Sequence, residues 1–481
     1  MNRTRRSLIA LGAVLLLAPP DAAHAGQPQQ SSRPNILFLL TDDQRWDAMG
    51  CAGNRVVQTP AMDRLAAEGT LFANAFATSS ICAASRATIF TGLYERSHRC
   101  NFNTGCLRRS QLERSYPVLL RRAGYYTGFI GKYGVEYAPA GGKRDIEGPE
   151  VFDRWYGFYG QGVYFPKEYP GKHLNEVMVD QACDFLENVP VGRPFCLSIS
   201  FKAPHSGQGY LGYDSEPDLK PRYAGVTIPP PATARQELFD ALPEFLRRSN
   251  ARTSYWQLRY GTPEKFQTTM RDYYGLVTGA DRAIGRIRGE LARRGLGDNT
   301  VLVFLSDNGD MIGDYLLGGK ELLYDASIRV PMIVFDPRAP KSARGQRRTE
   351  LATNLDVAPT LLDVAGVPVP ASMQGRSLVP LVHGRSVAWR EDFYCENHFC
   401  VPEQYYPIME GVRTARWKYV RYPEMKPVYE QLFDLAQDSG ETNDRARSAA
   451  DRGELERLRR RCDRLRTEAG SVDDRPVPGL R

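Results

Sequence analysis

The sequence predicts an α/β fold in which helices on both faces sandwich a large mixed, mostly parallel sheet. Continuous apolar runs bounded by turn-forming residues are typical of strands buried on both faces, and the first such run covers residues 35–40. Helical stretches separate these runs, as they do in α/β proteins. After about residue 385, alternating polar and apolar residues predict a smaller C-terminal antiparallel sheet and a terminal helix.

The elements of the large sheet follow one another along the chain. Thr59 and Pro60 predict the start of a helix over residues 60–68, and Gly69 ends it, because Pro suits the first helical position and Gly the position after the last. Further strands are predicted over residues 127–130, 195–201, 301–305 and 332–335. Further helices are predicted near residues 82–93, 113–123, 173–188, 265–294 and 354–364.

Two regions, residues 138–172 and 206–263, lack a regular pattern and are rich in Gly, Pro and aromatic residues. Irregular insertions of this length in a compact domain are commonly functional. The aromatic residues of the first region either stack on sugar rings or pack the loop against the domain. They are Trp155, Tyr156, Phe158, Tyr159 and Tyr164.

The C-terminal part predicts one antiparallel strand over residues 413–422, a second over 430–435, and a closing helix. One face of this helix is apolar and carries Leu455, Leu458, Cys462 and Leu465. The arginines between residues 457 and 466 form either its solvated outer face or a polyanion site.

A chain of 481 residues is too long for one ordinary domain. We expect a removable segment over residues 1–25, a large domain over 26–385 and a small α+β subdomain over 386–481. The apolar content of 42% excludes a disordered chain, and a net charge of +7 is too mild to indicate a nucleic-acid partner.

The first residues predict export to the periplasm or out of the cell. Three arginines precede an apolar run over residues 8–17, and a small-x-small sequence at 23–25 supplies a cleavage site, which is the pattern of a signal peptide. The paired arginines leave the Sec and twin-arginine routes both open. Neither this run nor any later segment is long and apolar enough to span a membrane, so we expect no stable membrane insertion.

The cysteines number nine, so at least one thiol stays unpaired in an oxidising compartment. Cys100–Cys106 and Cys395–Cys400 are the local pairs to test first. No Cys-x-x-Cys or His-x-x-x-His spacing indicates zinc.

Oxygen-bearing side chains follow two of the predicted strands. Asp42 and Asp43 come at the end of the first strand, and Asp307 and Asn308 come after the strand over 301–305. Ligands in open α/β sheets bind at the carboxyl ends of strands, so we expect these two ends to meet. An oxygen-only set suits Ca²⁺ or Mg²⁺, although a single Asp in such a place is more often a helix cap.

Cys82 opens a predicted helix, with Arg86 one turn further on the same face. A cysteine there is either a nucleophile with a lowered pKa or an inert buried thiol. Lys132, His205 and Lys320 each follow a strand end or a Gly-Gly turn. Together they provide positive charge and a proton donor, which a site for a tetrahedral anionic group requires.

These residues resemble the type I sulfatases of the alkaline phosphatase superfamily. The resemblance implies an alkaline-phosphatase-like fold and hydrolysis of sulfate esters, with a sulfated carbohydrate such as a glycosaminoglycan as substrate. Residues 131–137 are similar to the N-acetylglucosamine-6-sulfatase branch. The matching segments run in order along nearly the whole mature chain: residues 35–44, 59–69, 82–86, 91–92, 131–132, 204–205, 306–309, 320 and 329–331.

In these sulfatases a maturase oxidises the motif cysteine to formylglycine, whose hydrate is the nucleophile, and the resemblance assigns this role to Cys82. It assigns stabilisation of the deprotonated hydrate to Arg86 and Lys132. It implies that Lys320 stabilises the sulfate and that His205 stabilises either the sulfate or the leaving oxygen. The implied metal is Ca²⁺, with Mg²⁺ as the alternative, and its implied ligands are Asp42, Asp43, modified Cys82, Asp307 and Asn308.

Two residues depart from the family pattern. Ala84 stands where the motif Cys-x-Pro-Ser-Arg has proline, so conversion depends on a maturase of the host that accepts alanine. Gly134 stands where many members carry a histidine, which the N-acetylglucosamine-6-sulfatase branch also lacks.

Other functions remain open at this point. One is a phosphoesterase, phosphonate hydrolase or arylsulfatase of the same superfamily. Another is a catalytically silent sugar-binding relative in which Cys82 stays a thiol. The complete set of Arg86, Lys132, His205 and Lys320 favours an enzyme, because a binding protein has no need of every catalytic cation.

Overall fold

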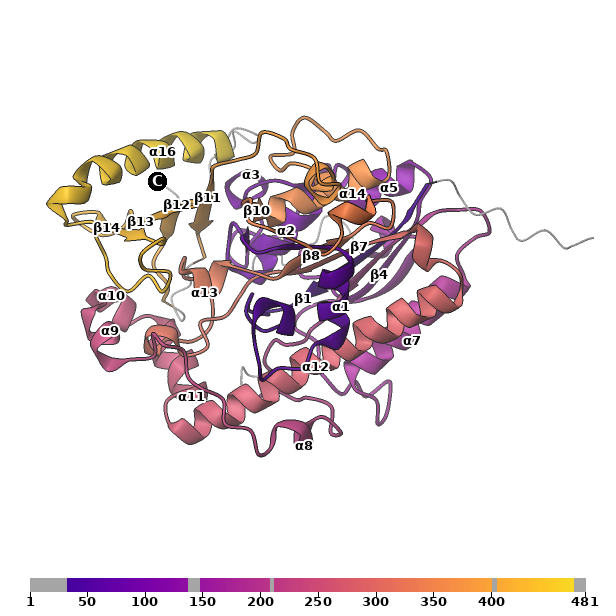
Figure 1. The fold of residues 1–481 in the computed structure, drawn as a ribbon, viewed down its shortest axis with the longest axis horizontal. Coiled ribbons are helices and arrows are strands. Elements are labelled where there is room, and N and C mark those ends of the chain that lie inside the picture. Colours follow the sequence, from indigo (N-terminus) through magenta and orange to yellow (C-terminus); the bar gives the residue numbers. More distant parts are fainter. Residues whose placement is uncertain (1–32, 137–147, 208–211, 400–404, 471–481) are drawn as a thin grey trace, which may run out of the picture.

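A computed structural model of the chain describes residues 33–136, 148–207, 212–399 and 405–470 (Figure 1). At its centre is an eight-stranded sheet with the order β5-β4-β6-β1-β7-β8-β2-β9. In that order the strands are Arg154–Phe158, Tyr126–Lys132, Phe195–Ser200, Asn35–Thr41, Thr300–Ser306, Met332–Phe335, Thr70–Phe72 and Gln346–Arg348. Neighbours from β5 to β7 are parallel, whereas β8 is antiparallel to both β7 and β2. The predicted mixed, mostly parallel sheet is confirmed.

Helices cover both faces of the sheet (Figure 1). Successive side chains of a strand point to opposite faces, so Leu37 and Leu39 of β1 enter one apolar cluster and Phe38 and Leu40 enter another. The first cluster includes residues of α1, α7 and α12, and the second includes residues of α2, α5 and α14. These helices are Pro60–Glu68, Leu174–Glu187, Pro263–Arg293, Cys82–Thr91, Tyr116–Arg122 and Val357–Val364.

Shorter elements connect these layers. The short helices are α3 Glu95–His98, α4 Arg109–Leu112, α6 Gly148–Val151, α8 Lys220–Tyr223, α9 Gln236–Ala241, α10 Glu244–Arg247, α11 Gln257–Arg259, α13 Asp325–Ile328 and α15 Val379–Val382. A small parallel pair joins β3 (Ala75–Phe76) to β10 (Ala352–Thr353).

The first region predicted to be irregular contains the edge strand β5. Trp155 of β5 stacks on Phe129 of β4 with ring centroids 5.3 Å apart, and Tyr164 is buried beside His173. These aromatic side chains therefore pack the segment against the sheet and the following helix. The second region, residues 206–263, also contains short helices, α8 to α11.

The C-terminal sheet has four antiparallel strands, ordered β11-β12-β13-β14. Their bounds are Asp392–Asn397, Met409–Thr414, Trp417–Tyr422 and Tyr429–Asp434. The prediction of one strand over residues 413–422 is wrong, because a turn divides this segment between two strands. The Thr414 hydroxyl accepts the backbone N–H of Trp417 at 2.7 Å and stabilises that turn. The domain boundary at residue 385 stays a prediction.

The terminal helix α16 (Arg452–Gly470) packs on this sheet through the predicted apolar face. Several of its arginines contact the sheet as well as solvent. Arg459 pairs with Glu430 and Arg461 with Asp392, each through two hydrogen bonds. The opposite face of the sheet packs on the large domain near α2, where Phe393 belongs to the same apolar cluster as Ile81 and Ala84.

Other predictions fall partly outside the described residues. The export segment, residues 1–25, lies outside them, and so does Cys400.

Cys100 and Cys106 are both free thiols, so the pairing suggested for them is not formed. In the described part of the chain, no helix combines the length and apolar character needed to cross a membrane.

Candidate active site

The carboxylate cluster lies where β1 and β7 end side by side. These parallel strands pair with Thr41 opposite Ser306, so the residues that follow, Asp42 and Asp307, come together. Asp43 adopts a left-handed conformation, with φ 67°, and its backbone N–H donates to Asp307 Oδ1 at 3.1 Å. Asp42, Asp43 and Asp307 each place an oxygen within 4.8 Å of the others.

The protonation of this cluster reflects burial and crowded charge. Burial favours the neutral form of Asp42, but Lys132, His205 and Arg86 hold its pKa well below the usual range. Burial, followed by the negative charge of Asp42, raises the pKa of Asp307. Such opposed shifts are expected when like charges are crowded in a buried site.

Asn308 supplies the observation that tests whether a metal ion fits. Its Nδ2 donates to Asp43 Oδ1 at 2.6 Å, while its buried Oδ1 has no hydrogen-bond partner among the described residues. Leaving a buried acceptor unpaired costs about 1–3 kcal/mol. A hard divalent cation such as Ca²⁺ or Mg²⁺ prefers carboxylate and amide oxygens. The residues present therefore fit the predicted metal.

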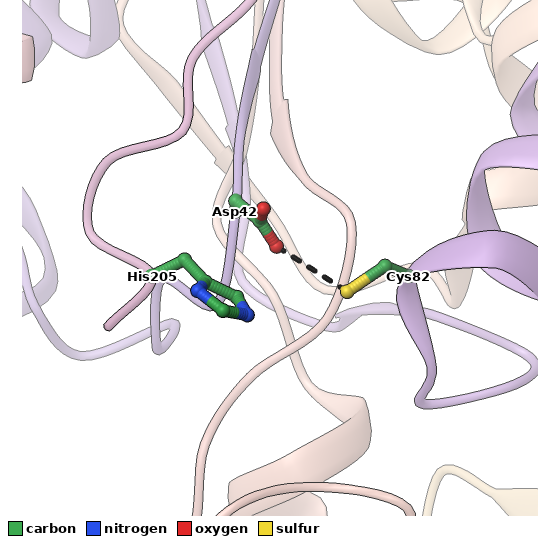
Figure 2. Close-up of side chains that lie close together, drawn as sticks. All are labelled: Asp42, Cys82 and His205. Atoms are coloured by element: carbon green, nitrogen blue, oxygen red, sulfur yellow. Dashed lines mark hydrogen bonds between the residues drawn. The ribbon is translucent and has the colours of Figure 1, made fainter. Parts of the chain in front are cut away.

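Cys82 lies at the first position of α2, beside the carboxylates. Its Sγ is 3.4 Å from Asp42 Oδ1 and 2.7 Å from Lys320 Nζ; Figure 2 shows Cys82 with Asp42 and His205. Burial and Asp42 raise the pKa of the thiol to about 12, despite Lys132 and Lys320. Of the two alternatives for the unmodified residue, these shifts favour the buried, protonated thiol over the thiolate.

The predicted cations surround the same point. Lys132 Nζ lies 2.6 Å from Asp42 Oδ2, and Lys320 Nζ contacts Asp43 and lies 3.9 Å from Asp42 Oδ1. Burial opposes the charge of Lys320, but Asp43 and its other neighbours raise the pKa well above the usual value. His205 Nε2 lies 3.7 Å from Asp43 Oδ2, and burial lowers the pKa of its imidazole well below the usual value.

Arg86 is a fully enclosed member of this set, with an exposed fraction of 1%. Its Nε donates to Asp307 Oδ2 at 2.9 Å, and one terminal nitrogen donates to the carbonyl of Lys132 at 2.8 Å and to Ser200 Oγ at 2.5 Å. The guanidinium thus joins α2, β7, β4 and β6. All the predicted site residues meet in one place.

Gly134 makes room for the Arg86 side chain. A Cβ added at Gly134 would lie 2.4 Å from Arg86 Cδ and 3.1 Å from Arg86 Nε, and the backbone there has φ +76°. A histidine at this position would need Arg86 to move. Glycine in place of the family's histidine at residue 134 therefore leaves the space that the Arg86 side chain fills.

Two polar side chains of the site were missed. Gln161 Oε1 accepts from Lys132 Nζ at 2.7 Å, but it follows β5, a strand that the sequence did not reveal. Lys202 is buried two residues after β6. Its place near a strand end, three residues before His205, is the same signal that identified Lys132.

The fold and this cluster define a hydrolase of the alkaline-phosphatase-like superfamily. The profile of the family described as "Sulfatase" matches residues 34–367, and that described as "N-sulphoglucosamine sulphohydrolase, C-terminal" matches residues 313–468. This chain belongs to the sulfatase family and is a sulfuric ester hydrolase.

A curated relative and a solved structure are each similar to most of this chain. An N-acetylglucosamine-6-O-sulfatase of Bacteroides thetaiotaomicron is 30% identical over 89% of this chain and 86% of its own length. The solved structure of BT4656, in complex with its substrate D-glucosamine-2-N,6-O-disulfate, superposes with a TM-score of 0.78 at 26% identity, over 94% of this chain and 100% of that one.

A second solved structure shares the fold alone. The phosphonate monoester hydrolase of Agrobacterium radiobacter superposes with a TM-score of 0.73 at 22% identity, over 91% of this chain and 96% of that one. The same architecture therefore serves a different ester chemistry, so the fold does not select the substrate.

Proposed function

We propose that this protein is exported and removes 6-O-sulfate from N-acetylglucosamine residues of a sulfated glycan, using formylglycine made from Cys82 and a bound Ca²⁺. The observation that carries this proposal is the position of Cys82. Its Sγ lies 3.4 Å from Oδ1 of Asp42, one of the expected metal ligands, and 2.7 Å from Nζ of Lys320. A nucleophile placed there meets both the metal ligands and a cation for the sulfate.

The thiol itself is not the nucleophile in this proposal. A maturase of the host, with dioxygen or a radical cofactor as the oxidant, removes two electrons and two protons from the –CH2–SH group of Cys82. Water supplies the aldehyde oxygen and the sulfur leaves as hydrogen sulfide. A second water then adds to the aldehyde to give a geminal diol. Arg86 and Lys132 stabilise the deprotonated diol through their positive charge. Ca²⁺ held by Asp42, Asp43, Asp307, Asn308 and the modified residue 82 would polarise the sulfate oxygens and favour the ionised diol.

The chain's own residues account for both bond-breaking steps. One diol oxygen attacks sulfur, the bond from sulfur to the leaving oxygen breaks, and His205 Nε2 donates a proton to that oxygen. A bound sulfate ester carries negative charge and favours the protonated imidazole, against the effect of burial. Lys320 holds the sulfate. The second hydroxyl then gives its proton to His205, which is now neutral, the carbonyl forms again as the bond from carbon to the sulfate oxygen breaks, and sulfate leaves.

The substrate class is supported by the relatives' known substrates. The Bacteroides relative is named an N-acetylglucosamine-6-O-sulfatase, and the structure of BT4656 holds its substrate D-glucosamine-2-N,6-O-disulfate. Residues 131–136 belong to the segment that resembles this branch, and Lys132 within it contacts Gln161. We infer that the loops after β4 and β6 select the leaving alcohol, as loops at strand ends commonly do.

A substrate panel tests the proposal. It pairs 6-O-sulfated N-acetylglucosamine and other sulfated mono- and disaccharides with nitrophenyl sulfate, nitrophenyl phosphate and a phenyl phosphonate ester. We expect the highest kcat/KM for a 6-O-sulfated sugar, with nitrophenyl sulfate also cleaved because its leaving group needs less help. Efficient cleavage of the phosphate or phosphonate esters alone would support the phosphonate hydrolase alternative. Cleavage of nitrophenyl sulfate without activity on any sugar would support an arylsulfatase.

A further inference from the structure

The segment from Lys202 to Ser206, which follows β6, is a turn tied at several points. The backbone N–H of His205 donates to the carbonyl of Lys202 at 2.9 Å. The hydroxyl of Tyr164 donates its hydrogen to the carbonyl of His205 at 2.5 Å, and the carbonyl of Lys202 lies 3.3 Å from the same hydroxyl. The backbone that carries the His205 ring is therefore held in place by Tyr164 and by its own hydrogen bond to Lys202.

One carbonyl in this turn accepts two side-chain donors. His205 Nδ1 lies 2.8 Å from the Ser206 carbonyl oxygen, and Lys202 Nζ lies 2.9 Å from the same oxygen. A carbonyl oxygen carries no hydrogen, so Nδ1 of His205 must be the protonated donor. The other ring nitrogen, Nε2, therefore faces the site and the Asp43 carboxylate.

The burial of the Lys202 ammonium is not explained by an ion pair. Its exposed fraction is 1%, and no described carboxylate forms an ion pair with it. Its ammonium lies 4.9 Å above the ring of Tyr164, whose face attracts a cation. Burial, together with Lys132, lowers its pKa to about 8, so it is still largely charged at neutral pH.

We propose that Lys202 is a positioning residue for His205. Its ammonium fixes the Ser206 carbonyl, the carbonyl fixes the Nδ1–H of the imidazole, and Nε2 is held toward the leaving oxygen of the substrate. This inference rests on the proposed function, in which His205 protonates that oxygen. Lys202 touches neither Cys82 nor the carboxylate cluster in any described hydrogen bond or ion pair.

The test measures how the rate depends on the leaving group. kcat/KM is measured for a series of aryl sulfates whose phenols span a wide range of acidity, and for the preferred sugar sulfate, with wild-type protein and Lys202→Met. A general acid contributes about 10²–10⁴-fold, mainly for poor leaving groups. We expect Lys202→Met to lose about 10- to 100-fold on the sugar sulfate and on the most basic phenols, and less than about 3-fold on nitrophenyl sulfate. Lys202→Arg, which keeps a charged donor, should restore part of the loss.

Two further variants separate positioning from folding. Tyr164→Phe keeps the ring under the ammonium but removes the hydroxyl that ties the turn, and should give a smaller loss with the same leaving-group dependence. In a His205→Ala background, Lys202→Met should cost little more, because residues that act through one group are not additive. The inference is overturned if Lys202→Met lowers kcat/KM equally for every leaving group, or costs as much without His205. If the wild-type protein cleaves no sulfate ester, the proposed function itself fails.

Discussion

Gly134 offers a sharp test of how the site is packed. The change is Gly134→Ala, at a position with φ +76° where the new methyl group would lie 2.4 Å from Arg86 Cδ. Gly171 provides a matched control, because it has φ +77° and an added Cβ there meets nothing within 4 Å. The two substitutions carry the same backbone strain, and only one of them displaces Arg86.

The expected magnitudes follow from these geometries. A non-glycine residue in the left-handed region costs about 1–2 kcal/mol, so both variants should lose about that much stability. Overpacking a closed site costs about 1–3 kcal/mol more, which should appear in Gly134→Ala alone. Arg86 holds Asp307 at 2.9 Å, and a shift of about 1 Å in such a site costs on the order of 10²-fold in rate.

Two assays separate the contributions. Equilibrium urea unfolding compares the stability of the two variants with that of the wild type, and kcat/KM on nitrophenyl sulfate compares their activity. We expect Gly171→Ala to lose stability with unchanged activity, and Gly134→Ala to lose more stability together with most of its activity. Equal stability and equal activity of the two variants would refute the reasoning about Arg86.

Three further predictions concern the nucleophile, the metal site and the C-terminal sheet. Cys82→Ala should abolish turnover and keep the fold, as seen by circular dichroism, because one small buried residue replaces another. Asp307→Ala should remove bound Ca²⁺, measured by elemental analysis. It should also lower the free energy of unfolding by about 3–5 kcal/mol, because buried Arg86 loses its partner. Stoichiometric zinc in active wild-type protein would contradict the calcium site. Although burial favours neutral Glu396, Arg96 and His398 lower its pKa from 4.5 to about 2. Its stabilisation is therefore complete above pH 4.5 and lost as the pH falls toward 2, and Glu396→Gln should flatten the unfolding free energy across that window.

The strand ends of the large sheet were predictable because they leave strong local patterns. Apolar runs that end in charged or amide residues located Asp42 and Asp307, and parallel pairing then made their meeting a matter of geometry. The direction of β8 was not predictable, because an antiparallel strand buried on both faces has the same apolar pattern as a parallel one. The hairpin near Thr414 was hidden for a similar reason, since its turn lacks Gly and Pro.

The parts of the site that were missed depend on tertiary contacts. Gln161 lies beside Lys132 only because β5 adds to the edge of the sheet, and its own sequence is glycine-rich and irregular. The protonation of Cys82 could not be read from its place at a helix start either. The helix start favours a thiolate, but burial and the nearby Asp42 outweigh it and raise the pKa.

The central claim is that residue 82 acts as formylglycine, and one measurement addresses it directly. Trypsin should release residues 65–86 as one peptide, because no Lys or Arg lies between Arg64 and Arg86. Protein from the native host, or from a host with a maturase that accepts alanine at residue 84, should give this peptide with an aldehyde at residue 82, seen by mass and by hydrazide labelling. Finding an unmodified thiol at residue 82 in protein that is fully active on sulfate esters would contradict the account.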